Sequence, residues 1–365
     1  MKILVTGSEG FIGKNLCLTL KQNQYEVIGF DRMTKTSLKE SVKQADFVMH
    51  LAGINRPLSA QEFYDGNTNL TYQLIDLLKK QNRQIPLLLS SSIQAEKDND
   101  YGKSKKQAEE HVFQYGKDTG SAVYVYRLEN AFGKWCRPNY NSVVATFCYN
   151  IAHHKEIRID NPDAEIPFVY IDDIVQAFIG SIGNAGSTDI LSVRPSYRVT
   201  IGHLAALLHN FQESRKTLII PNMADGFEKK LYAAYLSYLP EDEFCYPLVT
   251  HQDNRGSFTE FIKSEDRGQV SVNVTKPGIV KGNHWHHTKN EKFLVVKGQG
   301  VIRIRKIGET DIYTYAVNGD KLEVVDIPTG YTHNIENTGT DDMVTIMWCN
   351  ECYDPEYPDT YFEEV

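Results

Sequence analysis

The sequence has no long apolar run, no excess of positive charge and few cysteines for its length. No run approaches the roughly 20 apolar residues that span a bilayer. The 39 Lys and Arg against 47 Asp and Glu leave a net charge of −8, which argues against broad binding to nucleic acid or to an anionic membrane. Six scattered cysteines do not make a disulfide framework, and the turn at Gly7 comes too early for a signal peptide. We therefore expect a soluble, cytoplasmic protein.

The apolar content suffices for two domains. The sequence pattern of the first is typical of an open α/β sheet. Domains hold roughly 100–200 residues, and 41% of these 365 residues are hydrophobic. Helical spacing over 60–82 and 101–119 separates short, β-rich segments that are almost continuously apolar, as in buried parallel strands. These segments are Lys2–Val5, Tyr25–Phe30, Phe47–Leu51, Pro86–Leu89 and Ala122–Tyr126. The alternation predicts a Rossmann-type, doubly wound parallel sheet.

From about residue 258 the pattern changes to short strands separated by Gly, Pro and Asn turns. The clearest strands are Phe293–Val296, Val301–Arg305, Ile312–Ala316 and Met343–Trp348. This texture predicts an all-β sandwich or barrel. Two prolines near 240–247 interrupt the pattern, so we predict domains at 1–243 and 247–365.

A glycine-rich turn follows the first strand and opens a helix. Gly7, Gly10 and Gly13 are spaced three apart, with Phe11 and Ile12 between the last two. Such a turn lets the backbone approach a pyrophosphate at the N-terminus of a helix. The segment therefore predicts dinucleotide binding.

The end of the second strand offers both types of ribose contact. An acid such as Asp31 can hold the ribose hydroxyls of NAD, whereas Arg32 can pair with the 2′-phosphate of NADP. We favour NADP through Arg32.

A Tyr-x-x-x-Lys pair begins the helix predicted from residue 101. Tyr101 and Lys105 share one helical face, so the ammonium can lie near the phenol and lower its pKa. A run of three serines ending at Ser92 offers hydroxyls for a substrate carbonyl. A solvated helix face is the alternative for this pair taken by itself.

The combination of motifs resembles the extended short-chain dehydrogenase/reductase family, which acts on nucleotide-activated sugars. The motifs occur in family order: the glycine-rich turn, His50-Leu51-Ala52-Gly53, the three serines, Tyr101-x-x-x-Lys105 and Phe168-Val169-Tyr170-Ile171-Asp172-Asp173. The resemblance implies that Tyr101 is the general acid, that Lys105 lowers its pKa and holds the cofactor ribose, and that Ser92 binds the reacting carbonyl.

The same resemblance assigns further contacts over about residues 1–240. It places Leu51, Ala52 and Gly53 against the cofactor and Asn130 near the substrate, and Asn67 fits the helix asparagine of the family. Ile93-Gln94-Ala95 stands where relatives often carry Val-Tyr-Gly, which changes the local substrate contacts. Arg137, in an aromatic and amide-rich loop, is a candidate for a pyrophosphate or sugar contact, or a surface charge.

The second half contains a set of metal-ligand residue types. His284 and His286 are two apart and can face one side of a strand, Glu291 follows a short turn, and His333 lies on a later segment. Such a set suits Zn, Fe or Mn. The spacing resembles the two cupin motifs, although Gly319 lies further from Pro328 than the usual pattern. We expect a divalent metal, zinc first, either five-coordinate or with one of the four residues not bound.

Together the two halves resemble the CapF-type bifunctional enzymes of capsular polysaccharide synthesis. The resemblance implies that the cupin epimerises C3 of UDP-2-acetamido-2,6-dideoxy-L-hexos-4-ulose. The reductase then reduces the C4 ketone with NADPH to UDP-N-acetyl-6-deoxy-L-talosamine, on the way to N-acetyl-L-fucosamine. It also implies a homodimer. The epimerase base is unassigned, with Lys292, Tyr331 and His287 as candidates. The alternatives are a reductase whose cupin only stabilises or dimerises the protein, or a cupin that senses sugar or is an independent iron oxygenase.

Overall fold

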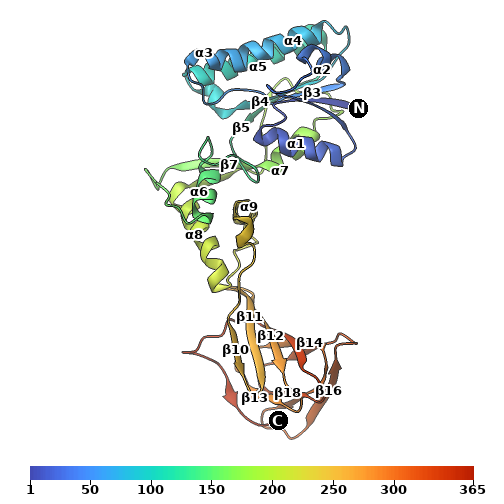
Figure 1. The fold of residues 1–365 in the computed structure, drawn as a ribbon, viewed down its shortest axis with the longest axis vertical. Helices are drawn as coiled ribbons and strands as arrows, with labels where there is room; N and C mark the ends of the chain where they lie inside the picture. The colour runs from blue at the N-terminus through green and yellow to red at the C-terminus, as the bar shows by residue number, and fades with distance from the viewer. The chain divides into compact units, whose positions relative to one another are not determined.

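The chain folds into two compact units, each described here by itself (Figure 1). The computed structural model describes residues Met1–Val365. The first unit comprises Met1–His209 and Gly226–Pro240, and the second comprises Asn210–Asp225 and Glu241–Val365. The domain limits 1–243 and 247–365 stay a prediction, and the compact units differ from them in counting Asn210–Asp225 with the second unit.

A six-stranded parallel sheet forms the centre of the first unit. Its order is β2-β1-β3-β4-β5-β8, with every neighbouring pair parallel. The strands are β1 (Lys2–Thr6), β2 (Glu26–Phe30), β3 (Phe47–His50), β4 (Leu87–Ser92), β5 (Val123–Leu128) and β8 (Ile190–Leu191). The chain moves from β1 to β2 on one side and then to β3 on the other, so the order reverses between β1 and β3.

Helices cover both faces of this sheet, which explains why its strands are apolar on both sides. Ile3 and Val5 face α1 (Phe11–Gln22) and α7 (Ile171–Ile179) in one buried cluster. Leu4 points the other way, into a second cluster. That cluster is completed by α2 (Leu38–Gln44), α4 (Leu70–Lys79) and α5 (Asp100–Thr119). The predicted doubly wound sheet is confirmed.

The rest of the first unit adds a small sheet and further helices. The small sheet consists of β6 (Asn130–Phe132), β7 (Glu165–Tyr170) and β9 (Tyr197–Thr200). The helices are α3 (Ala60–Phe63), α6 (Val143–Ala152), α8 (Ile201–Thr217), which continues into the second unit, and α9 (Gly226–Leu236). The helix predicted over 60–82 is divided by a π-helical turn at Tyr64–Asn69. No helix of the chain combines the length and apolar character needed to cross a membrane.

Antiparallel strands make up the body of the second unit, as the sequence predicts. One sheet has the order β10-β11-β12-β19-β14-β17 and the other β16-β15-β18-β13-β20. The first contains β10 (Thr250–Asp253), β11 (Gly256–Ser264), β12 (Gly268–Thr275), β19 (Met343–Cys349), β14 (Glu291–Lys297) and β17 (Val324–Ile327). The second contains β16 (Ile312–Asn318), β15 (Gln299–Lys306), β18 (Tyr331–Asn337), β13 (Val280–Trp285) and β20 (Tyr361–Phe362). Alternate residues of both sheets, among them Phe293, Ile302 and Ile335, form the buried core between them.

Candidate active site and candidate metal centre

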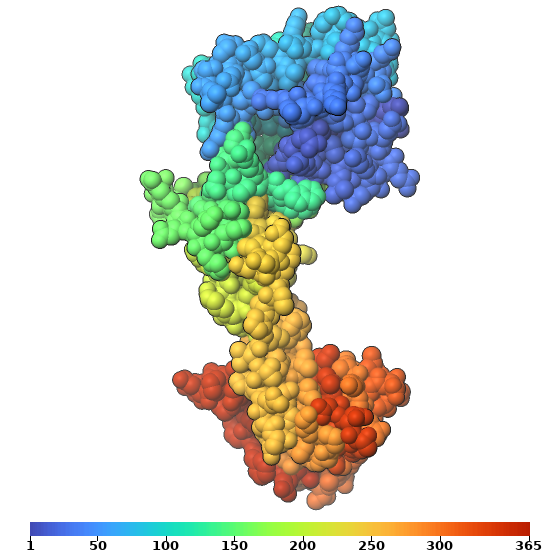
Figure 2. Space-filling model, viewed as in Figure 1, coloured from blue at the N-terminus to red at the C-terminus, as the bar shows by residue number.

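A cleft of about 860 Å³ opens in the first unit, beside the carboxyl ends of the parallel strands. The reversal of strand order between β1 and β3 is where doubly wound sheets bind ligands. Most of the predicted site residues line this cleft: Gly7, Gly10, Phe11, Ile12, Gly13, Leu51, Gly53, Ser92, Tyr101, Lys105, Asn130 and Arg137. Many of these lining residues belong to the N-terminal part of the chain, dark blue in Figure 2, and to the green part. Figure 2 shows these two parts next to each other on the surface of the first unit.

The glycine-rich turn is built so that side chains do not fit. Gly7 has a φ of 72°, and a Cβ there would lie 2.8 Å from the backbone nitrogen of Ala52. A Cβ on Gly13 would lie 2.1 Å from the carbonyl oxygen of Gly7. The close approach of these backbones leaves the N-terminus of α1 open to the cleft, as anion binding requires.

Three of the predicted cofactor contacts do not line the cleft. The backbone N–H of Ala52 donates to Thr6 Oγ1 at 3.2 Å. Asp31 directly follows β2, and its carboxylate accepts from the backbone N–H groups of Glu9 at 3.2 Å and Arg32 at 2.7 Å. The Arg32 side chain is exposed. The choice of NADP through Arg32 stays a prediction.

Ser92, Tyr101 and Lys105 meet in the cleft because β4 ends where α5 begins nearby. Asn99 caps α5 by accepting from the backbone N–H of Gly102 at 2.8 Å. Burial raises the pKa of Tyr101, and a hydrogen bond with Ser92 opposes the rise. A phenol in this state is protonated at neutral pH and is ready to donate a proton. The lowering of its pKa by Lys105 stays a prediction.

A backbone carbonyl and a nearby carboxylate, which the sequence did not indicate, act on the ammonium of Lys105. Its Nζ donates to the carbonyl oxygen of Ser90 at 2.8 Å. Burial lowers the pKa of Lys105 to about 8, and the carboxylate of Glu109 opposes this shift. Glu109 is itself buried and accepts from Ser91 Oγ. Its position one turn after Lys105 is the only signal that the sequence carries for this role.

Polar groups on other loops complete the wall of the cleft. Asn67, from the π-helical turn, donates to Ile54 O and Ser104 Oγ, each at 3.0 Å. Asn130 donates to Pro167 O at 3.0 Å. The Arg137 guanidinium lies 5.3 Å from the centre of the Tyr140 ring. The Tyr140 hydroxyl in turn donates to Asn55, a lining residue that the sequence analysis missed.

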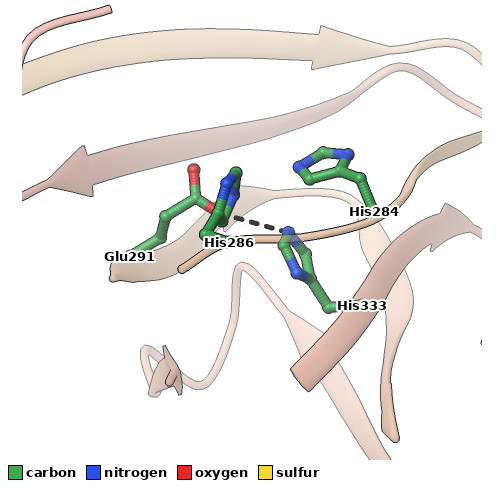
Figure 3. Close-up of side chains that lie close together, drawn as sticks. All are labelled: His284, His286, Glu291 and His333. Carbon is green, nitrogen blue, oxygen red and sulfur yellow. Dashed lines mark ion pairs between the residues drawn. The ribbon is translucent and has the colours of Figure 1, made fainter. Parts of the chain in front are cut away.

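The four predicted metal ligands come together in the second unit (Figure 3). His284 lies on β13, His286 directly after it, Glu291 at the start of β14 and His333 on β18. Glu291 Oε2 is 3.1 Å from His333 Nε2 and 3.4 Å from His286 Nε2. One ligand atom from each of the four residues lies within 4.8 Å of the others.

The chemistry of this cluster fits a cation. His286 Nε2, Glu291 Oε2 and both ring nitrogens of His333 are buried without a hydrogen-bond partner, which is costly for polar atoms. Burial raises the pKa of Glu291, but His286 and His333 hold it below its usual range, so the carboxylate is ionised. Burial lowers the pKa of His284 to about 4, which keeps the imidazole neutral. The carboxylate of Glu291 and the neutral imidazole of His284 are ligand forms that zinc binds.

The candidates for an epimerase base lie elsewhere. The His287 ring makes edge-to-face contacts with the rings of Trp285 and Tyr361, with ring centres 4.5 Å and 4.9 Å away. The Lys292 ammonium pairs with Asp326 at the surface. Tyr331 packs against the apolar core of the barrel. The base stays unassigned.

Comparison with protein families assigns most of the chain. Residues 3–191 match the NAD dependent epimerase/dehydratase family, and residues 251–361 match the polysaccharide biosynthesis C-terminal domain. The chain belongs to the NAD dependent epimerase/dehydratase family. Membership in this family implies a nicotinamide cofactor for the cleft of the first unit.

Two similar proteins match this chain over nearly its whole length. A UDP-2-acetamido-2,6-beta-L-arabino-hexul-4-ose reductase of Pseudomonas aeruginosa is 48% identical over 99% of this chain and 98% of its own. The structure of the capsular polysaccharide assembling protein CapF of Staphylococcus aureus matches with a TM-score of 0.94 and 51% identity, covering 100% of both chains. The predicted likeness to CapF-type enzymes, and with it the reductase-plus-cupin architecture, is confirmed.

A more distant structure shares the fold of the first unit. The UDP-glucuronic acid 4-epimerase of Bacillus cereus, solved with UDP-glucuronic acid and NAD, matches 65% of this chain with a TM-score of 0.56 and 18% identity.

Proposed function

We propose that this protein is a nucleotide-sugar enzyme that reduces the C4 ketone of a UDP-linked 4-keto-6-deoxy amino sugar. The observation that carries the proposal is the convergence of Ser92, Tyr101 and Lys105 with the glycine-rich turn in one cleft. The full-length likeness to a UDP-sugar reductase supports the substrate class. The substrate is UDP-2-acetamido-2,6-dideoxy-L-hexos-4-ulose, after inversion at C3, and the setting is capsular polysaccharide synthesis.

In this proposal the cofactor NADPH supplies a hydride to C4. Ser92 hydrogen-bonds the C4 oxygen and orients the ketone. Tyr101, protonated because burial raises its pKa, donates the proton that the oxygen gains as the C–H bond forms. Lys105, held at Ser90, binds the cofactor ribose and compensates the negative charge left on the phenol. The net change is ketone, NADPH and a proton to alcohol and NADP⁺.

We further propose that the second unit epimerises C3 before reduction. His284, His286, Glu291 and His333 hold a divalent cation, zinc first, in the cluster described above. Such a cation would supply Lewis-acid polarisation of the C4 oxygen, which would make the neighbouring C3 proton acidic. Epimerisation would then need one group to remove that proton and one to return a proton on the opposite face, and neither group is assigned.

The reductase step is tested with the keto sugar and NADPH. We expect one NADPH oxidised per sugar reduced, and a talosamine configuration in the product by nuclear magnetic resonance. No oxidation of NADPH by the purified protein would contradict the proposal.

The division of labour is tested with His284→Ala. This variant should still oxidise NADPH on substrate already inverted at C3, but not on the uninverted sugar. Equal rates on both substrates would favour the alternative in which the cupin only stabilises or dimerises the protein.

A further inference from the structure

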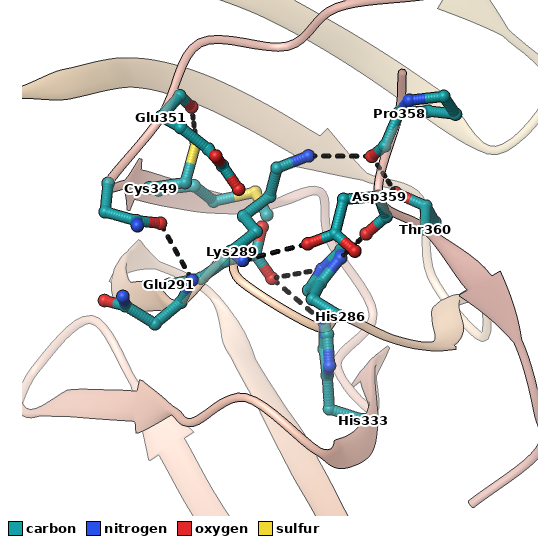
Figure 4. Close-up of polar contacts among 12 residues, drawn as sticks. His286, Lys289, Glu291, His333, Cys349, Glu351, Pro358, Asp359 and Thr360 are labelled. Carbon is teal, nitrogen blue, oxygen red and sulfur yellow. Dashed lines mark hydrogen bonds and ion pairs between the residues drawn. The ribbon is translucent and has the colours of Figure 1, made fainter.

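The C-terminal segment contacts β13, which carries His284, and the turn that begins at His286. Figure 4 shows Pro358 and Asp359 of this segment beside His286 and Lys289. β20 pairs antiparallel with β13, so that Phe362 is opposite His284 and Tyr361 is opposite Trp285. Pro358 and Asp359, just before β20, contact the turn that follows β13.

The carbonyl oxygen of Asp359 fixes the proton on His286. It accepts a hydrogen bond from His286 Nδ1. Because a carbonyl oxygen can only accept, Nδ1 carries the hydrogen, and in the neutral ring Nε2 is the nitrogen with the free lone pair. Nε2 is the nitrogen that faces Glu291, 3.4 Å from Oε2. The contact therefore selects the tautomer in which His286 can bind a cation inside the cluster.

The carboxylate of Asp359 holds the turn itself. Oδ1 accepts from the backbone N–H of His287 at 3.0 Å. Oδ2 accepts from the backbone N–H groups of Thr288 at 2.9 Å and Lys289 at 3.0 Å, and from Thr288 Oγ1 at 3.0 Å. The carboxylate thus joins the turn between His286 and Glu291 to the C-terminal segment.

Two further features indicate that the contact between the C-terminal segment and the turn is a specific one. Asp359 has a φ of 40°, in the left-handed region. A residue other than glycine adopts this backbone conformation only where its surroundings stabilise it. The buried Lys289 donates from Nζ to Pro358 O at 3.0 Å, which binds the two segments from the other side.

We propose that Asp359 is the positioning residue of the metal centre. Its carbonyl sets the tautomer and direction of His286, and its carboxylate fixes the turn that leads to Glu291. Asp359 does not touch the cation. The inference rests on the proposed metal site and goes beyond it by assigning the residue that orders the ligands.

The test measures metal affinity and the His286 tautomer in the full chain. Stripped protein is titrated with Zn²⁺ against a coloured chelator. Asp359→Gly keeps the left-handed backbone and the carbonyl, but it loses the carboxylate that holds this carbonyl against the turn. We expect zinc to bind about 10- to 100-fold more weakly, the usual effect of disturbing the hydrogen-bond partner of a ligating histidine. Asp359→Asn, whose amide oxygen still accepts, should lose less. Glu356→Gln, an exposed acid in the same segment, should bind like the unmodified protein.

The ring nitrogens of His286 give a second readout, from nuclear magnetic resonance of the metal-free protein. For the neutral ring, we expect one Nδ1–H tautomer in the unmodified protein. In Asp359→Gly we expect a mixture, because the carbonyl of residue 359 is no longer held in place by a carboxylate. Unmodified zinc affinity in Asp359→Gly, or an unchanged tautomer, would overturn the inference. If Asp359→Gly fails to fold, Lys289→Met decides, with weaker zinc binding expected and unchanged binding overturning the inference. Failure of the unmodified protein to bind any divalent metal would overturn the proposed metal site as well.

Discussion

The guanidinium of Arg127 donates two hydrogen bonds to the buried carboxylate of Glu109: Nε lies 3.0 Å from Oε1, and Nη2 lies 2.7 Å from Oε2. The pair joins β5 to α5, and neither residue lines the cleft. Since Glu109 also accepts from Ser91, one carboxylate connects the serine run of β4, the helix of Tyr101 and Lys105, and the next strand. The ion pair between Arg127 and Glu109 therefore holds together the elements that carry the candidate active site.

Glu109→Gln should destabilise the first unit. Removing one partner of a buried ion pair leaves the other charge poorly compensated, and we expect a loss of about 3 kcal/mol. Denaturant unfolding followed by a probe in the first unit measures it. Glu110→Gln, exposed at the next position of α5, is the matched control and should change little. Equal stability of both variants would contradict the role of the pair.

The pH dependence of cofactor binding should report Lys105. Its pKa is lowered to about 8 by burial, so the ammonium is lost as the pH rises through that value and NADPH affinity should fall. In Glu109→Gln the fall should occur at lower pH, because the carboxylate no longer favours the charged form. Lys106→Gln, exposed on the same helix, should keep the profile of the unmodified protein. Fluorescence titration with NADPH provides the measurement, and an affinity that stays constant through this range would refute the assignment.

Tyr101→Phe should reduce the rate of ketone reduction by about 10²- to 10⁴-fold, the usual contribution of a general acid. NADPH binding should persist, because the phenyl ring keeps its place in the cleft. Tyr72→Phe, on the exposed face of α4, is the control. Undiminished NADPH oxidation by Tyr101→Phe would remove it from the mechanism.

Zinc should stabilise the second unit through the four-residue cluster. A ligand at 100 times its dissociation constant adds about 2.7 kcal/mol to the folded state. We expect a higher unfolding temperature of the second unit on adding Zn²⁺, and a much smaller rise in Glu291→Gln. Glu265→Gln, in an exposed turn, should respond like the unmodified protein. An equal rise in all three proteins would place the metal elsewhere.

Local patterns in the sequence predicted the parts that depend on nearby residues. The strand predicted at Lys2–Val5 is β1 at Lys2–Thr6, and the helix predicted from Tyr101 is α5 from Asp100. The glycine-rich turn and the His-x-His pair were visible because their function requires fixed spacing. The proposed roles of these residues remain predictions.

Contacts between distant segments left no comparable signal. Asp359 lies 73 residues from His286, and nothing around it in the sequence marks it as a partner of that imidazole. The π-helical turn at Tyr64–Asn69 lies within an uninterrupted helical pattern, so its effect on Asn67 was invisible. Arg32 was favoured by its type, but the structure leaves it exposed and outside the cleft.

Hydrogen exchange at C3 tests the central claim, that the two units perform successive steps on one sugar. The keto sugar is incubated with the protein in deuterated water without NADPH, and deuterium at C3 is followed by nuclear magnetic resonance. We expect deuterium to enter C3 with the unmodified protein and with Tyr101→Phe, and not with His284→Ala. No exchange with the unmodified protein would contradict the account.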